Sequence, residues 1–378
     1  MRGSTFYVRT VDGNYKFNPT VNLFQPTKEQ SPYKSIHERP LEKREFSNVR
    51  EAKKFLNEYK DILDIHGQDN FLYQIIHEQY SHTDQPSVKD IRVHAIDIEV
   101  DVPTGAGFPK PDEAKFPINA ITVSDSITNK IVSFGLGHWN KDDAIQRNEL
   151  TQEIADRVIY KNCDNEEDLL LSYLAFIKEN QPHVITGWNS DSFDMIYIYT
   201  RLCVLFSEDT AKKLSPWGMV DVIDVKGLYG KTHKEVDIKG IALLDYLKLY
   251  KKFTFKTRDS YKLDAIAHVE LEKRKLSYDE EKSLFTLAQN NFQKFISYNI
   301  LDAILVDELD EKLKLLPLVF DIAWKAKINF EDVLSPVKTW DALCCNELIE
   351  NNVVPPLSKP PKKKKKYEGG FVKEPISG

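Results

Sequence analysis

The chain has 378 residues, of which 41% are hydrophobic and 29% charged, the composition of an ordinary soluble globular protein. Its length allows two domains, no apolar run could span a bilayer, and the N-terminus shows no secretory signal. The net charge of −6 disfavours a protein that grips DNA over its whole surface, but it permits a local basic groove. The four cysteines form no C-x-x-C pair, which favours a reduced compartment and excludes a structural zinc site: Cys163, Cys203, Cys344 and Cys345.

The first 90 residues predict a small mixed domain. Short runs of β-forming residues at Thr5–Val11 and Thr20–Phe24 predict strands, and the pattern at Val49–Tyr59 predicts a helix. No motif that carries chemistry occurs in this part of the chain.

From Lys89 the pattern changes to that of a larger α/β domain. Ile91–Val100 is rich in β-branched residues and predicts a strand that is buried on both faces. Apolar periodicity at Asn165–Glu179 predicts a helix. The other expected elements are strands at Ala120–Val123, Lys130–Phe134 and His183–Trp188, a hairpin of Asp221–Leu228 and Glu235–Ala242, and helices at Phe193–Phe206, Leu263–Leu271, Tyr278–Gln289 and Gln293–Leu315. This order predicts an α/β (α+β) fold in which helices flank a mixed sheet.

Beyond Leu315 the sequence again shows a mixed pattern of helix and strand signals, and it ends in a segment rich in proline and lysine. Val353–Gly378 contains several prolines and the five-lysine run Lys362–Lys366. Prolines favour extended backbone and like charges repel, so a solvated linker is expected. The alternative is that the lysines bind phosphate groups.

Two carboxylates within the predicted strand Ile91–Val100 give the strongest functional signal. Asp97 and Glu99 are two residues apart and therefore point to the same face. Side by side in a buried sheet they would repel each other unless a cation lies between them. A divalent metal is the simplest such cation, whereas a strand end open to solvent would need none.

A second cluster follows the strand His183–Trp188. Asn189, Phe193 and Asp194 lie where that strand passes into a helix, a common place for functional side chains in α/β proteins. Helix capping by Asn189, with Asp194 near the positive end of the helix dipole, explains the same residues without a function.

A third pair lies on the predicted helix Gln293–Leu315. Tyr298 and Asp302 are four residues apart and share one helix face, where a phenol could orient a water beside a metal-bound carboxylate. An exposed acidic face is the alternative. Taken together, the three clusters supply four acids from three elements. Such a set is suited to two divalent metal ions about 3.5–4 Å apart, and oxygen ligands favour Mg²⁺ or Mn²⁺.

The three clusters resemble motifs I, II and III of the DnaQ-like (DEDDy) exonucleases. Longer segments resemble the family B DNA polymerases of T-even-type bacteriophages, from about residue 40 to the C-terminus. These segments are IRVHAIDIEV, ITGWNSDSFDMIYIYTR, AKKLSP, LDYLKLYKKFTF, FISYNILDAILV and SPVKTWDALCCNELIENNVVP.

The resemblance implies a role for each matching residue. The metal-binding carboxylates would be Asp97, Glu99, Asp194 and Asp302. Tyr298 would position the attacking water, and Lys275 would lie near the scissile phosphate. Asn189 and Phe193 would face the substrate, and the segment 225–240 would form a hairpin that helps to separate the primer end from its template.

The resemblance also implies an architecture. Residues 1–90 and 315–358 would form an N-terminal domain around an RNase H-like exonuclease domain at 91–314, and residues 359–378 would lead toward a palm. The polymerase motifs D-x-x-S-L-Y-P-S, K-x-x-x-N-S-x-Y-G and D-T-D are absent from the sequence, so polymerisation would require a separate part.

The expected activity is the proofreading 3′→5′ hydrolysis of single-stranded or frayed DNA in the cytoplasm of an infected bacterium. The expected partners are the primer–template 3′ end, a polymerase part and phage replisome proteins, without a membrane. A non-catalytic nucleic-acid-binding and docking subunit and a ribonuclease of similar fold are the alternatives.

Overall fold

A computed structural model describes the chain except residues 11–12, 86, 227–231 and 358–378. The chain divides into two compact units. The smaller unit comprises residues 1–6, 16–81 and the C-terminal part from residue 342, and the larger unit comprises residues 7–15 and 82–341. The lysine run Lys362–Lys366, for which a solvated linker was predicted, lies outside the described residues.

The smaller unit joins the two ends of the chain in one sheet. The short strand β14 (Val353–Val354) pairs in parallel with β4 (Tyr33–Ser35), so a C-terminal strand completes a sheet of N-terminal strands. The remaining strands of this sheet, in the order β14-β4-β5-β3, are β5 (Pro40–Phe46) and β3 (Val21–Pro26). The helices are α1 (Val49–Tyr59), α2 (Phe71–Tyr80) and the C-terminal part of α13 (Pro336–Glu350). A hairpin of β1 (Phe6–Thr10) and β2 (Gly13–Phe17) contributes residues to both units.

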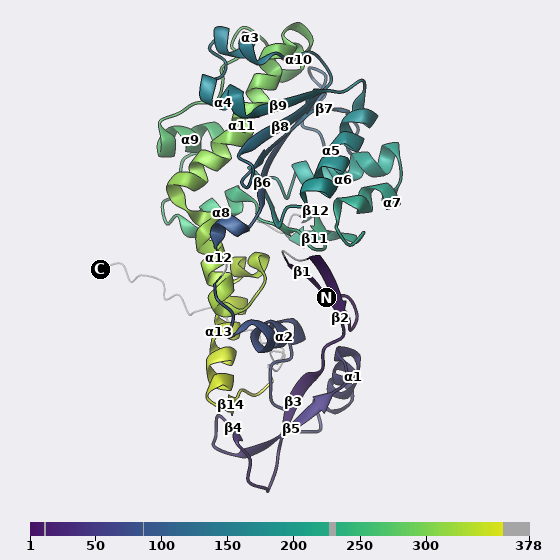
Figure 1. Ribbon diagram of the computed structural model, residues 1–378, viewed down its shortest axis with the longest axis vertical. Coiled ribbons are helices and arrows are strands. Elements are labelled where there is room, and N and C mark those ends of the chain that lie inside the picture. Colours follow the sequence, from purple (N-terminus) through teal and green to yellow (C-terminus); the bar gives the residue numbers. More distant parts are fainter. Residues whose placement is uncertain (11–12, 86, 227–231, 358–378) are drawn as a thin grey trace, which may run out of the picture. The chain divides into compact units, whose positions relative to one another are not determined.

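A mixed sheet forms the centre of the larger unit (Figure 1). Within the described residues its strand order is β13-β10-β6-β7-β8-β9. The strands are β6 (Val93–Val100), β7 (Ile118–Asp125), β8 (Lys130–Gly135), β9 (Val158–Asn162), β10 (Val184–Thr186) and β13 (Ala242–Leu243). Strands β6, β10 and β13 are parallel to one another, so their carboxyl ends lie at the same edge of the sheet.

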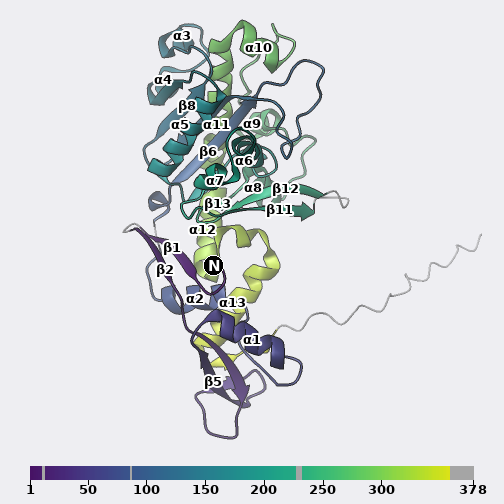
Figure 2. The same cartoon turned by 90° about the vertical axis from the view of Figure 1, so that its right-hand side faces the viewer.

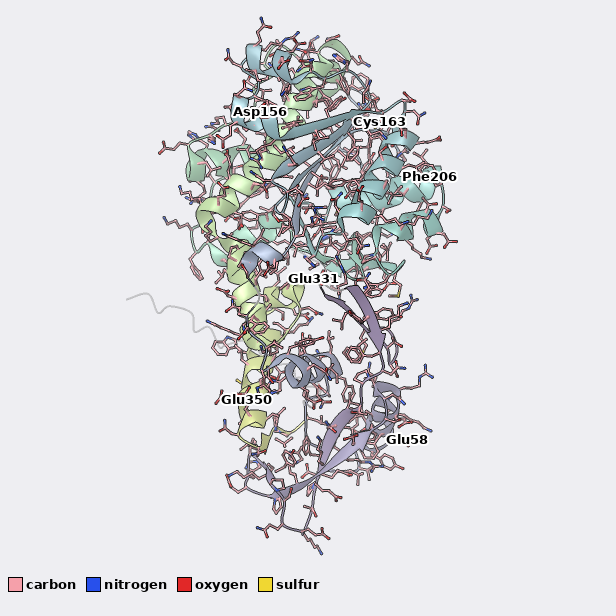
Figure 3. The ribbon with its side chains drawn as sticks, viewed as in Figure 1. Glu58, Asp156, Cys163, Phe206, Glu331 and Glu350 are labelled. Atoms are coloured by element: carbon pink, nitrogen blue, oxygen red, sulfur yellow. The ribbon has the colours of Figure 1, made fainter. Side chains whose placement is uncertain are left out.

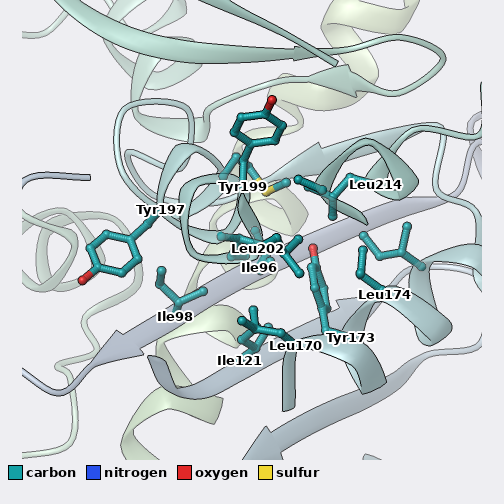
Figure 4. Packing of buried hydrophobic residues seen from close by; sticks show 14 of the residues in the cluster. Ile96, Ile98, Ile121, Leu170, Tyr173, Leu174, Tyr197, Tyr199, Leu202 and Leu214 are labelled. Carbon is teal, nitrogen blue, oxygen red and sulfur yellow. The ribbon is translucent and has the colours of Figure 1, made fainter. Parts of the chain in front are cut away.

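Helices cover both faces of this sheet, as the sequence predicts. On one face Ile96 and Ile98 of β6 pack among residues of α5 (Glu166–Asn180) and α6 (Asp194–Leu205), and Figure 4 shows them beside Leu170 and Tyr173. On the other face α11 (Phe292–Leu313) packs against β6, β7 and β8. The alternation of side chains along β6 therefore turns Asp97 and Glu99 away from the α5–α6 core and toward α11.

The remaining elements are short helices and one hairpin. The hairpin consists of β11 (Val220–Lys226) and β12 (Thr232–Ile238), which extend from the sheet in Figure 2, and most of its turn lies outside the described residues. The helices are α3 (Lys141–Gln146), α4 (Gln152–Arg157), α7 (Glu208–Ala211), α8 (Tyr246–Phe253), α9 (Leu263–Leu271), α10 (Leu284–Asn290) and α12 (Leu315–Ala326), with short 3-10 turns at Val88–Asp90, Lys212–Leu214 and Phe330–Leu334.

Two expectations about the C-terminal half need correction. The helix expected at Tyr278–Gln289 begins only at Leu284, because Ser283 and Thr286 form a capping box that starts a new helix there. The region beyond Leu315, expected to be mixed, is mainly helical. Residues 315–341 group with the larger unit, so the chain returns to the smaller unit at Ala342.

Two further observations concern the whole described chain. No helix in the described ranges is both long and apolar enough to cross a membrane. All four cysteines lie in the described ranges and none of them forms a disulfide bond, including the buried Cys163 labelled in Figure 3.

Candidate metal centre

Strand β6 carries the first two acids of the site. Asp97 and Glu99 are both partly exposed, whereas the intervening Ile98 is buried in the opposite face. The pairing of β6 with β7 shifts register between Glu99 and Val100, an irregularity of the kind that is frequent beside functional sites. The two carboxylates thus lie near the end of the strand, on the face that α11 covers.

Helix α11 supplies the third acid. Asp302 is buried and Tyr298 lies one helical turn before it on the same side of the helix. Atom Oδ2 of Asp302 is ion-paired with Lys275, while Oδ1 is buried and has no hydrogen-bond partner among the described residues. A buried oxygen without a donor is costly, so Oδ1 is suited to receive a ligand that the chain itself does not provide.

Asp97, Glu99 and Asp302 form what we call the three-carboxylate cluster. One oxygen atom from each of the three side chains lies within 4.8 Å of the others. All the candidate ligand atoms are carboxylate oxygens, the hard type of ligand that Mg²⁺ and Mn²⁺ prefer. The convergence of these oxygens and the unpartnered Oδ1 of Asp302 fit a divalent cation.

The electrostatics of the cluster also favour a bound cation. Removal from water raises the pKa of Glu99 to about 8, and the negative charge of Asp302 contributes to that rise. The pKa of Asp97 is raised well above its ordinary value, first by burial and then by the charges of Asp302 and Glu99. A cation held among these groups would lower all of these pKa values and stabilise the ionised forms.

Lys275 and Tyr298 border the cluster. The ammonium Nζ of Lys275 donates to Tyr298 Oη at 3.1 Å and to Asp302. Burial opposes the charged form of Lys275, but Asp302, Tyr298 and Asp97 outweigh it and raise the pKa of this lysine. Burial and the charge of Asp302 raise the pKa of Tyr298, so its phenol remains a hydrogen-bond donor.

Asp194 lies beside the cluster without belonging to the group of three. It begins α6, and its Oδ1 accepts a hydrogen bond of 3.1 Å from the backbone nitrogen of Ile98, between the two acids of β6. Burial raises the pKa of Asp194 to about 7, although hydrogen bonds from the backbone oppose that rise. Its charge in turn raises the pKa values of Asp97 and Glu99.

A glycine lets the loop that carries Asp194 approach β6. A Cβ atom on Gly187 would lie 2.6 Å from the carbonyl oxygen of Ile96, a backbone atom that cannot easily move. Two residues later Asn189 adopts a left-handed backbone conformation, with φ 68°. The close approach after β10 thus depends on glycine and on an asparagine that tolerates this conformation.

The two residues predicted to face the substrate are placed differently from the acids. The backbone nitrogen of Asn189 donates to Asp245 Oδ1 at 3.0 Å, which ties the loop to the start of α8. The ring of Phe193 is partly exposed and lies 5.3 Å from that of Phe108, which is 81% exposed. Within the described part of the chain, neither Asn189 nor Phe193 forms a hydrogen bond or a ring contact with the three-carboxylate cluster. Their roles in binding substrate therefore remain predictions.

Sequence reasoning missed two polar residues near the site. Asn299, next to Tyr298, is fully buried and donates to Asp97 Oδ2 at 2.7 Å. An amide within the apolar run ISYNILDAILV is the signal that could have identified it. Lys248 of α8 bridges Asp191 and Glu235, at 2.8 Å and 2.7 Å, and we call these three residues the Lys248 cluster.

Comparison with known proteins assigns the chain to a family. Residues 67–266, more than half of the chain, match the model of the exonuclease domain of DNA polymerase family B. The matched region includes Asp97, Glu99 and Asp194 and ends before Tyr298 and Asp302.

The similar proteins include DNA polymerases of viruses. The DNA-directed DNA polymerases of Escherichia phage RB69 and Enterobacteria phage T4 are 36% and 35% identical to the chain, over 99% of its length. The chain spans 43% of the length of each of these two relatives. A DNA polymerase catalytic subunit of Psittacid herpesvirus 1 is 31% identical over 44% of this chain and 15% of its own length. The chain therefore belongs to the family B DNA polymerases, and it contains their exonuclease domain.

Proposed function

We propose that the chain hydrolyses the 3′-terminal phosphodiester of single-stranded or frayed DNA, with two divalent cations, Mg²⁺ or Mn²⁺, at the candidate metal centre. Asp97, Glu99 and Asp302 would hold one cation, and Asp97 and Asp194 would help to hold the second. The observation that carries the proposal is the three-carboxylate cluster, because its oxygen atoms converge within 4.8 Å and the described residues offer no hydrogen-bond donor to Asp302 Oδ1.

The residues around the cluster are suited to phosphodiester hydrolysis. Bound divalent cations would activate the attacking water and stabilise charge on the attacking and leaving oxygens. The protonated phenol of Tyr298 can orient that water through a hydrogen bond. Lys275 carries a fixed positive charge and can bind a non-bridging phosphate oxygen once a cation replaces its contact with Asp302. Water adds to phosphorus, the bond to the 3′ oxygen breaks, and that oxygen receives a proton, which releases a nucleoside 5′-monophosphate.

The depth of the site favours a single-stranded end as substrate. Asp194 and Asp302 are buried, and Asp97 and Glu99 are only partly exposed. A base-paired terminus cannot reach such groups without being unpaired, whereas a frayed strand can. We further propose that the hairpin of β11 and β12 helps to separate the primer end from its template.

A basic segment rich in aromatic residues supports binding of a single strand. Residues 251–262 contain five lysines or arginines and one acidic residue. Within this segment Phe255 is 98% exposed. The segment is tied to the loop after β10, because Trp188 Nε1 donates to the carbonyl oxygen of Tyr261 at 3.0 Å. Exposed rings beside positive charges bind single strands by stacking and by charge attraction, without a requirement for sequence.

The proposal extends to the cellular role. Because the phage relatives are DNA polymerases more than twice as long as the matched chain, we propose that this exonuclease acts with a polymerising part and other phage replisome proteins. Its substrate would then be the primer–template 3′ end in the cytoplasm of the infected host.

The direct test is digestion of a 5′-labelled single-stranded oligodeoxynucleotide with Mg²⁺ or Mn²⁺. The wild-type chain is expected to give a ladder that shortens from the 3′ end, and EDTA, Asp97→Ala and Asp302→Ala are each expected to abolish it. Glu311→Gln is the matched control, because Glu311 is an exposed acid on the same helix as Asp302, and this variant should retain activity.

The result also distinguishes the alternatives. A folded wild-type chain that binds the oligonucleotide but never shortens it, with or without added polymerase part, would favour the non-catalytic binding module. Preferential digestion of RNA would favour a ribonuclease.

A further inference from the structure

Asn299 connects the candidate metal centre to the interior of the sheet. The residue lies on α11 between Tyr298 and Asp302 and is fully buried. Its amide nitrogen Nδ2 donates to Asp97 Oδ2 at 2.7 Å, across 202 residues of sequence. Its amide oxygen Oδ1 lies 2.5 Å from Thr122 Oγ1 on β7. Thr122 Oγ1 also lies 2.9 Å from Ser133 Oγ on β8.

The chemistry of the groups fixes the direction of these hydrogen bonds. A carboxylate and an amide oxygen can only accept, so Asn299 must donate to Asp97 and must accept from Thr122. The Thr122 hydroxyl is oriented to donate both to Asn299 Oδ1 and to Ser133 Oγ, and the amide oxygen is the nearer acceptor. The result is a chain of two donors, Thr122 to Asn299, which ends at the carboxylate of Asp97. The opposite orientation of the amide would place Asn299 Oδ1 against the Asp97 oxygen, and two acceptors would face each other.

This arrangement differs from the way the chain holds Asp302. Lys275 contacts Asp302 with a full positive charge and so competes with any cation for it. Asn299 contacts Asp97 with a neutral amide, which fixes the carboxylate but leaves its negative charge available. It engages Oδ2 only, so the orientation of Oδ1 is set while that atom remains open to a ligand.

Other acids lie close to Asp97, which gives such a support a purpose. Burial is the main cause of the raised pKa of Asp97, and the charges of Asp302, Glu99 and Asp194 add to it; their repulsion also tends to turn the carboxylate away from them. A hydrogen bond from a donor that cannot ionise opposes that movement. Because Asn299 and Thr122 are both fully buried, water does not compete for the bonds.

We infer that Asn299 is a positioning residue for cation binding, held in one amide orientation by Thr122. The inference rests on the proposed function, since it assigns to Asn299 the orientation of a proposed metal ligand. Residues that hold metal ligands in place typically change metal affinity about 10–100-fold when they are replaced. Replacing Asn299 should therefore change the affinity for the cation and not the rate of hydrolysis once the cation is bound.

The test uses two substitutions that keep side-chain volume. Asn299→Leu removes the donor to Asp97, and Thr122→Val removes the donor that fixes the amide. Titration calorimetry with Mn²⁺ in the absence of DNA is expected to show Kd raised about 10–100-fold by Asn299→Leu. Thr122→Val should raise it about fivefold, the equilibrium effect of one neutral hydrogen bond, and Thr122→Ser should restore the wild-type value.

A kinetic measurement separates positioning from a direct part in the reaction. Hydrolysis of p-nitrophenyl thymidine 5′-phosphate would be followed as a function of Mn²⁺ concentration. The Mn²⁺ concentration for half-maximal rate should rise with the Kd, while the rate at saturating Mn²⁺ should stay within a few-fold of wild type.

Ser297→Ala is the matched control for a purely structural effect. Ser297 is equally buried on α11 and hydrogen-bonds Glu149 and Trp139, away from the three-carboxylate cluster. If Asn299→Leu lowers the melting temperature as Ser297→Ala does, and neither changes the Kd for Mn²⁺, the inference is overturned although the proposed function stands. A wild-type chain that neither binds Mn²⁺ nor hydrolyses the substrate would reject both.

Discussion

Two groups of buried and partly buried carboxylates lie in the larger unit, and the chain balances their charge in different ways. In the Lys248 cluster one ammonium group lies between Asp191 and Glu235 and contacts both. In the three-carboxylate cluster Lys275 contacts Asp302, whereas the side chain of Asp97 accepts its hydrogen bond from a neutral amide, that of Asn299. Glu99 accepts no hydrogen bond from the described part of the chain. In the first group one ammonium thus contacts both acids, whereas in the second it contacts one acid of three, which leaves the larger excess of negative charge there.

The comparison shows what distinguishes a structural group of acids from a candidate metal centre. Burial raises the pKa of Asp191 as it does that of Glu99, so a perturbed pKa does not separate the two groups. The distinguishing feature is whether an ammonium group contacts each carboxylate directly. Where it does not, the remaining charge favours a cation from solution, and the acids can be retained for function at a cost in stability.

The largest expected effect is the loss of activity when the negative charge of Glu99 is removed. Glu99→Gln should lower the rate of oligonucleotide digestion by about 10³-fold or more, because a divalent cation contributes several kcal/mol to such a reaction and each 1.4 kcal/mol is tenfold in rate. The free energy of unfolding in EDTA should not fall, since the variant removes repulsion from Asp302. Gel-based digestion and urea denaturation measure the two quantities. A variant with the wild-type rate would contradict the assignment of Glu99.

The sequence made this prediction possible because local geometry determines which side chains share a face. Asp97 and Glu99 share a strand face, and Tyr298 and Asp302 share a helix face, at spacings that are independent of the rest of the fold. Long elements with regular apolar patterns were equally predictable: Val49–Tyr59 and Leu263–Leu271 agree with α1 and α9.

Partners that tertiary structure brings together could not be predicted in the same way. Asn299 meets Thr122 across 177 residues, and Lys248 meets Asp191 across 57, so no local pattern specifies either contact. Helix α12 was not predicted, since the pattern beyond Leu315 was read as mixed, and it contains Pro317. The proline falls in the first turn, where its missing N–H is not needed.

The next effect concerns Asp245, a buried acid beside the Lys248 cluster that forms no ion pair with a lysine of the described ranges. Its Oδ1 accepts from the backbone nitrogens of Asn189 and Leu247, and its Oδ2 has no partner among the described residues. Burial and the charge of Asp191 raise the pKa of Asp245 to about 7, although Lys248 and the two backbone donors oppose the rise. Since the folded form holds a proton that the unfolded form has lost, stability is full below about pH 4 and falls as the pH rises to 7.

Asp245→Asn should remove this pH dependence, because an asparagine oxygen can accept the same two hydrogen bonds without a charge. Relative to the variant, the wild-type chain should lose up to about 4 kcal/mol of unfolding free energy between pH 4 and pH 8, at about 1.4 kcal/mol for each unit of pKa shift. Urea denaturation at pH 5 and pH 8 measures the difference. If the wild-type chain and Asp245→Asn lose the same unfolding free energy between pH 5 and pH 8, Asp245 is ionised throughout and the prediction is wrong. The control Glu311→Gln should lose the same unfolding free energy as the wild-type chain.

Replacing the lysine of each group sharpens the comparison directly. Lys248→Met leaves Asp191 and Glu235 without their cation and should cost about 2–3 kcal/mol of unfolding free energy, less than a fully buried pair because Lys248 is about one-third exposed. The loss should be the same in Mg²⁺ and in EDTA. Lys275→Met should cost less in Mg²⁺ than in EDTA, because a bound cation would replace the lost charge at Asp302. Equal losses for Lys275→Met in both conditions would remove the distinction between the two groups.

The smallest expected effect is the stabilisation of the wild-type chain by the cation itself. A ligand that binds only the folded form adds RT ln(1 + [L]/Kd), which is about 1.4 kcal/mol when Mg²⁺ is present at ten times its Kd. Urea denaturation at rising Mg²⁺ concentration should show this gain in the wild-type and Lys248→Met chains, because the Lys248 cluster takes no part in binding. Asp97→Ala should abolish the gain, since it removes a ligand from the three-carboxylate cluster. A gain that survives Asp97→Ala but disappears with Lys248→Met would place the cation at the Lys248 cluster. The group whose acids contact a lysine would then be the metal centre, and the three-carboxylate cluster would not.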